Sequence, residues 1–143
     1  MKRISLCLLL TSFVITPFVQ ASNTESASLD HAQVTYVQAT QSQNGSWCFN
    51  TQVHHNDQGW KHYADAWQVL DLQGNVLGER KLLHPHDNEQ PFTRSLCNVQ
   101  IKPDLQKVVI RAKCNDHGWG DKTVTVNLLS ETGKGFKVTR NNK

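Results

Sequence analysis

The sequence predicts an all-β fold, a seven-stranded β-sandwich of the immunoglobulin or fibronectin type. Short runs of alternating apolar and polar residues recur along the chain, and no segment of useful length has a helical period. An alternation of period two is typical of a strand with one buried face. Turn signals recur about every 8–12 residues, as expected when short strands build a sandwich.

The seven predicted strands follow the alternation in chain order. They cover residues 33–39, 47–55, 65–72, 75–83, 92–101, 107–114 and 121–129. The short connections contain Asn44-Gly45-Ser46, Gln73-Gly74 and Pro103, residue types that favour turns. Trp47 and Trp67 fall on inward strand positions and are predicted to be core residues.

The N-terminus predicts export. Lys2 and Arg3 precede an apolar run over residues 4–19, and Val19-Gln20-Ala21 offers the small residues of a signal-peptidase site. Residues 1–21 are therefore predicted to be a cleaved signal peptide. A membrane-spanning helix needs roughly 20 apolar residues, and this run is interrupted by Thr16-Pro17. We expect a periplasmic or secreted protein without a transmembrane segment in its mature chain.

The rest of the chain is long enough for one domain. Residues 22–31 are polar and predicted to be disordered, residues 32–130 form the sandwich domain, and residues 131–143 are predicted to be a basic C-terminal tail. Removal of Lys2 and Arg3 takes the net charge from +3 to +1. This near-neutral balance argues against nucleic acid as a partner, and we expect a monomer.

The mature chain has three cysteines, of which an oxidising compartment can pair two. The alternation places Cys97 and Cys114 on inward positions and Cys48 on a polar face. We predict a Cys97–Cys114 disulfide, worth about 3 kcal/mol. The alternative is Cys48–Cys114, which would resemble the inter-sheet bridge of immunoglobulin domains.

The histidines are predicted to gather at one end of the sandwich. If each strand crosses the sandwich once, the loops at residues 55–64, 84–91 and 115–120 share an end. Six of the seven histidines lie in or beside these loops, whereas His31 lies near the start of the domain. Solvated loops favour Gly, Asn, Asp, Ser and Pro instead, so this distribution needs an explanation.

Two interpretations of the histidines remain open. The first is a transition-metal site for Zn or Cu, because neutral imidazoles from several loops can surround one ion. Its candidate ligands are His55, His62, His84, His86 and His117, with Asp57, Asp65 and Glu89 as acceptors for the outer ring nitrogens. The second is structural: the histidines bond carbonyls and carboxylates and hold long loops together. No spacing here matches an established zinc motif.

Aromatic residues in the same loops offer a different function. Trp60, Tyr63 and Trp119 can form a floor for a sugar or a protein partner, which would make the protein an adhesion or interaction module. No nucleophile elbow or credible triad is present. We therefore predict no catalytic residue and favour a non-enzymatic role; the third alternative is an enzyme, because a three-histidine metal site with an open position would permit hydrolysis.

The pattern GWxHYADxW, then LLHPHxxEQPFTRSL, then HGWG resembles a family of small secreted bacterial proteins without an assigned activity. The resemblance covers residues 47–128 and rests on a recurring set of positions: His55, Asp57, Gly59, Trp60, His62, Tyr63, Asp65, Trp67, His84, Pro85, His86, Glu89, Gln90, Pro91, Phe92, His117 and Gly118. It implies an exported or periplasmic Gram-negative protein. The cysteines are not general in that pattern, so the resemblance implies no function for them.

Overall fold

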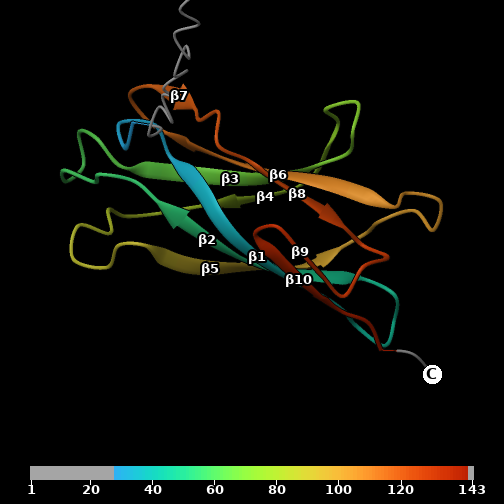
Figure 1. Ribbon diagram of the computed structural model, residues 1–143. Coiled ribbons are helices and arrows are strands. Elements are labelled where there is room, and N and C mark those ends of the chain that lie inside the picture. Colours follow the sequence, from blue (N-terminus) through green and yellow to red (C-terminus); the bar gives the residue numbers. More distant parts are fainter. Residues whose placement is uncertain (1–27, 142–143) are drawn as a thin grey trace, which may run out of the picture.

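The computed structural model describes residues 28–141, and these residues form two β-sheets without a helix (Figure 1). The predicted all-β architecture is confirmed, but the predicted number of seven strands is wrong. The ten strands are β1 (Gln33–Gln41), β2 (Trp47–His54), β3 (Ala64–Leu70), β4 (Val76–Lys81), β5 (Phe92–Val99), β6 (Lys107–Cys114), β7 (Gly118–Trp119), β8 (Val124–Asn127), β9 (Thr132–Gly133) and β10 (Phe136–Thr139). No described segment is a helix able to cross a membrane. The predicted signal peptide lies outside the described residues.

The two sheets each contain five strands. The first has the order β5-β2-β1-β10-β9, with β1 and β2 antiparallel and β1 and β10 parallel. The second has the order β4-β3-β6-β7, and β8 also pairs with β6. The immunoglobulin or fibronectin topology remains a prediction.

The hydrophobic core lies between the sheets, and alternation along the strands builds it. In β2 the odd positions from Trp47 to Val53 are buried and the even ones are partly exposed. Phe49 of the first sheet and Trp67 and Ile110 of the second are fully buried. Full burial of such an aliphatic or phenyl side chain contributes about 1.5–3 kcal/mol. The prediction that Trp47 and Trp67 are core residues is confirmed.

The C-terminal segment is part of the first sheet and is not the solvated tail that its basic residues predict. Strand β10 pairs in parallel with β1, in a register that places Phe136 opposite Val37 and Val138 opposite Ala39. Phe136 and Val138 are buried. These two apolar residues are too few to predict a strand from the sequence. The neighbouring strand β1 supplies the hydrogen bonds and the apolar surface that make this segment a strand.

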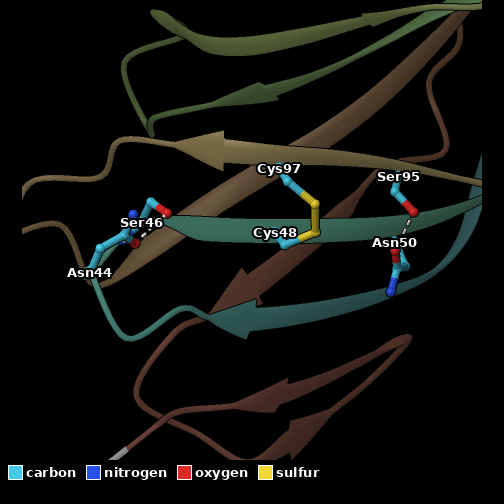
Figure 2. Close-up of a disulfide and its surroundings, with 6 residues drawn as sticks. All are labelled: Asn44, Ser46, Cys48, Asn50, Ser95 and Cys97. Atoms are coloured by element: carbon cyan, nitrogen blue, oxygen red, sulfur yellow. Dashed lines mark hydrogen bonds between the residues drawn. A yellow bond between two sulfur atoms is a disulfide. The ribbon is translucent and has the colours of Figure 1, made fainter.

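The predicted Cys97–Cys114 disulfide is wrong, as is the Cys48–Cys114 alternative. Cys97 bonds to Cys48 (Figure 2). Cys114 is a buried free thiol. The reason is a β-bulge in β5: Trp47 pairs with Val99 but Phe49 pairs with Leu96, so β5 has one extra residue, and Asn98 has a φ of 61°. An extra residue reverses the alternation. Cys97 therefore turns outward, beside Cys48.

The predicted gathering of the three loops at one end is confirmed. Figure 1 shows the β2–β3, β4–β5 and β6–β8 connections on the left and the other turns mostly on the right. The Gly59 N–H donates to the Asp87 carboxylate at 2.9 Å, which joins the first loop to the second. The Tyr63 N–H donates to the Asn115 side-chain oxygen at 2.9 Å, which joins the first loop to the third. We call residues 55–64, 84–91 and 115–120 the histidine-rich end.

Candidate metal centre

Two histidines of one loop and a cysteine distant from them in the sequence meet at the histidine-rich end. His55 follows β2, His62 precedes β3, and Cys114 is the last residue of β6. One ligand atom from each of the three lies within 4.8 Å of the other two. His55 and Cys114 are each only 1% exposed, and His62 is half-buried. Imidazole nitrogens and thiolates are the ligands that Zn and Cu prefer, so this group can hold such an ion.

The orientation of His55 is fixed by a buried carboxylate. Its Nδ1 lies 2.6 Å from Oδ1 of Asp57, and its Nε2 lies 3.1 Å from the Asp30 carbonyl oxygen. The Nδ1–H donates to Asp57, which leaves Nε2 directed at the cluster. A carboxylate on the outer ring nitrogen is the arrangement that orients metal-bound histidines. The predicted role of Asp57 therefore has a matching geometry.

Asp57 also connects two other segments to His55. Its Oδ1 accepts the Ala64 N–H at 3.0 Å, and its Oδ2 accepts the His86 N–H at 2.7 Å. Burial raises the pKa of the Asp57 carboxyl, but the hydrogen bonds from His55, His86 and Ala64 outweigh it and lower the pKa below its usual value. The carboxylate stays ionised as the common acceptor of these segments.

Cys114 and His117 form the other side of the cluster. The His117 N–H donates to Sγ of Cys114 at 3.2 Å, and the His117 Nδ1 lies 3.7 Å from the same sulfur. The His117 Nδ1 also lies 3.1 Å from Nε2 of His62. Ligands around one tetrahedral zinc ion are about 3.3–3.8 Å apart, from bonds of about 2.0–2.3 Å. His117 is therefore close enough to add a fourth ligand from the solvent side.

The three ligand atoms of the cluster converge on one backbone oxygen. The Asp30 carbonyl lies 3.1 Å from Nε2 of His55, 3.2 Å from Nε2 of His62 and 3.4 Å from Sγ of Cys114. Full bonding would require a proton on all three groups, yet a carbonyl oxygen has only two lone pairs. A metal ion can replace those protons and satisfy all three ligands at once.

His84 and His86 do not belong to this group. The His84 ring is exposed, and its Nδ1 lies 3.0 Å from the Pro85 carbonyl oxygen. The His86 ring is buried and stacks on Phe92, with ring centroids 3.8 Å apart. Neither ring nitrogen of His86 has a hydrogen-bond partner among the described residues, and its Nδ1 is 3.8 Å from Oδ2 of Asp57. The His86 ring therefore packs against Phe92 without the ring hydrogen bonds of the structural interpretation, and the backbone N–H of His86 is what bonds to Asp57.

The other two predicted acceptors have ion-pair partners elsewhere. Asp65 accepts from Nζ of Lys113 at 3.0 Å, and Glu89 pairs with Arg94 at 2.8 Å. The hydrogen bond from Arg94 lowers the pKa of the Glu89 carboxyl. Desolvation raises this pKa, but by less. Among the described residues, neither carboxylate forms a hydrogen bond or an ion pair with a histidine of the cluster.

The loop aromatics lie on the outside of the same end. Trp60 is 67% exposed and meets Tyr63 edge to face, with ring centroids 5.8 Å apart. Trp119 is 37% exposed and lies beneath the Arg111 guanidinium, whose carbon is 4.0 Å from the ring centroid. The cation already covers one face of Trp119. Trp60 and Tyr63 therefore form the more accessible aromatic pair.

Sequence reasoning missed two members of the cluster. The first is Cys114, for which the alternation predicts a disulfide. The overlooked signal is that His117 follows Cys114 by three residues, so a thiol and an imidazole lie at the same strand end. The Asp30 carbonyl carries no sequence signal at all, because every residue has one. His31 also approaches the cluster, since its ring centroid lies 5.3 Å from that of His117.

The fold and the cluster define a class: a two-sheet β protein with a buried histidine–cysteine group at one end. A relative from Halomicrobium mukohataei, described as a "Putative lipoprotein", is 36% identical over 113 residues, which is 78% of this chain and 55% of that protein. The chain thus spans about half the length of this curated relative. No family model matches the chain, and no solved structure matches it.

Proposed function

We propose that this chain is an exported protein that binds one transition metal ion, Zn or Cu, through His55, His62 and Cys114. The observation that carries the proposal is the convergence of these three ligand atoms within 4.8 Å of one another. His55 and His62 belong to one loop, between β2 and β3, and Cys114 at the end of β6 is distant from both in the sequence. A cation bound by all three ligands would satisfy them together, whereas the Asp30 carbonyl oxygen has only two lone pairs for three hydrogen bonds.

Export is supported by three separate features. The N-terminal sequence has the pattern of a signal peptide. A disulfide between Cys48 and Cys97 joins β2 to β5, and disulfides persist in oxidising compartments. The Halomicrobium relative is described as a "Putative lipoprotein", and lipoproteins are exported before they are anchored.

The test is metal content and metal titration on protein purified without an added histidine tag. We expect one Zn or Cu ion per chain and a rise in melting temperature on loading, since a ligand that binds only the folded state stabilises it. His62→Ala and Cys114→Ser should each weaken binding at least tenfold. His84→Ala is the matched control, because that exposed ring lies outside the cluster, and it should bind like the parent.

Two results would contradict the proposal. One is a folded parent protein that takes up neither zinc nor copper. The other is an equal loss of binding in His84→Ala and His62→Ala, which would place the ion elsewhere or show binding without a defined site. Thermal unfolding of each variant separates loss of the ligand from loss of the fold.

The exposed Trp60–Tyr63 pair favours a second candidate, an interaction module. A tryptophan that is 67% exposed adds little to the core, whereas it suits a partner's apolar surface or a sugar ring. Trp60→Ala should leave the free energy of unfolding within about 0.5 kcal/mol of the parent. If Trp60→Ala abolishes binding in a glycan array or to an exported partner while metal content is unchanged, the interaction function gains support.

A further inference from the structure

We propose that the cluster is a copper–thiolate redox centre that accepts and donates single electrons. This inference rests on the proposed metal-binding function and goes beyond it by naming the metal and its chemistry. The ligands are the imidazoles of His55 and His62 and the thiolate of Cys114, with the Asp30 carbonyl as a weak fourth donor.

The donor set is what distinguishes copper from zinc here. Two imidazoles and one thiolate in a trigonal arrangement, with a weak axial ligand such as a backbone oxygen, hold copper in electron-transfer sites. The Asp30 oxygen is 3.1, 3.2 and 3.4 Å from the three donor atoms, so it lies at a nearly equal distance from each of them. Near-equal distances to all three donors are what an axial donor to a trigonal set would have.

The ligands are held in place by contacts outside the cluster. Asp57 fixes the His55 ring at 2.6 Å, and the N–H groups of Ala64 and His86 fix Asp57. Cys114 ends a central strand and pairs with Gly118 of β7. A site whose ligands are locked by such supporting contacts rearranges little when the charge of the ion changes. Small rearrangement favours fast electron transfer between Cu(II) and Cu(I).

The sulfur also receives a hydrogen bond from the backbone. The His117 N–H lies 3.2 Å from Sγ of Cys114. Hydrogen bonding around the cysteine sulfur is one of the features that tune the potential of a copper–thiolate site. The thiol is buried, so the sulfur is shielded from direct attack by large solutes.

The imidazole side of the cluster offers the route for the electron. His55 and Cys114 are buried, but His62 is half-buried and the side chain of His117 is 40% exposed. The His117 ring centroid lies 4.9 Å from that of His62. Cu(II) takes one electron from a one-electron donor protein at this edge and becomes Cu(I), which later passes the electron to a one-electron oxidant. No bond breaks and no proton is required.

The experiment is addition of one equivalent of Cu(II) to the tag-free exported protein, followed by visible absorption and electron paramagnetic resonance. We expect an intense thiolate-to-copper absorption band. Ascorbate should bleach the band by reducing Cu(II), and ferricyanide should restore most of it over repeated cycles. Cys114→Ser should lose the band, and the control His84→Ala should keep it.

Three outcomes would overturn the inference. Copper bound without a thiolate band, or a band equally strong in Cys114→Ser, would exclude the copper–thiolate assignment. A band that decays irreversibly as Cys114 is oxidised would exclude redox cycling. In each case zinc or cobalt bound through Cys114 leaves the metal-binding proposal standing, whereas a folded protein that takes up none of these metals overturns both.

Discussion

Nδ1 of His55 lies 2.6 Å from Oδ1 of Asp57, and both side chains are completely buried. The same carboxylate accepts N–H groups from Ala64 and His86, so one side chain joins the β2–β3 loop, the start of β3 and the β4–β5 loop. The candidate metal centre and the loop architecture thus depend on one buried acceptor.

Asp57→Asn should weaken both metal binding and the fold. The amide keeps the shape but removes the charge, and it offers only one oxygen to three donors. Loss of such a supporting partner typically reduces metal affinity about 10–100-fold, and an unsatisfied buried donor costs about 1–3 kcal/mol. Metal titration and urea denaturation measure the two effects. Asp104→Asn, at an exposed turn carboxylate, is the control, and an Asp57→Asn protein with its full affinity would contradict this role.

The Asp57 carboxylate should also stabilise the fold in a pH-dependent way. Its pKa is below the usual 3.8 in the folded state, so the unfolded chain takes up the proton first as the pH falls. The stabilisation is fully present above pH 3.8 and is lost as the pH falls through the folded-state pKa. Urea denaturation between about pH 5 and about pH 2 should show a steeper loss for the parent than for Asp57→Asn. Equal slopes would contradict the assignment.

His86 should make the protein less stable in mild acid. Burial and the nearby charges of Arg94 and His84 lower the pKa of the His86 ring. They outweigh the raising effect of the Asp57 and Glu89 carboxylates, so this pKa lies below 6.5. The unfolded chain therefore binds a proton that the folded chain resists, and stability falls as the pH drops below 6.5. His86→Phe keeps a ring against Phe92 and the N–H to Asp57 while it removes the titration. Its free energy of unfolding should change less between about pH 7 and about pH 5 than that of the parent.

The Cys48–Cys97 disulfide should stabilise the protein without affecting the cluster. It joins residues 49 apart in sequence, and a closed loop of that size is worth about 4 kcal/mol in the chain-entropy account. The double variant Cys48→Ala/Cys97→Ala should lose stability in guanidinium denaturation. Its metal stoichiometry should equal that of the parent, because the bridge links β2 and β5 on the outer face of the first sheet. Loss of metal from a folded double variant would overturn this separation.

Gly120→Ala should disturb the backbone that lies over the cluster. A Cβ at this position would collide with the Ala32 carbonyl oxygen, two residues after Asp30. The collision should move the Asp30 carbonyl and lower metal affinity about tenfold or more in the titration, as loss of a supporting contact does. At Gly78 a Cβ would meet only the side chains of Leu96 and Val99, so Gly78→Ala is the control. Unchanged affinity in Gly120→Ala would show that the Asp30 carbonyl position is not needed.

The sequence by itself determined that the chain forms two β-sheets and that most of its histidines share one end. Both follow from local features: alternation identifies strands such as Trp47–His54, and consecutive crossings place every second loop at the same end. The signal was strong for β6, whose predicted bounds agree with the structure. It did not decide which histidines meet, because a loop position fixes the end of the sandwich and not the direction of a side chain.

Only the tertiary structure decided the composition of the cluster. One bulge residue in β5 turned Cys97 outward to Cys48, which left Cys114 free beside His55 and His62. Likewise β10 exists because β1 is beside it, and the Asp30 carbonyl belongs to the site because of where the backbone passes. These contacts join residues far apart in the chain. Their free energy depends on register and packing between strands, which local alternation does not specify.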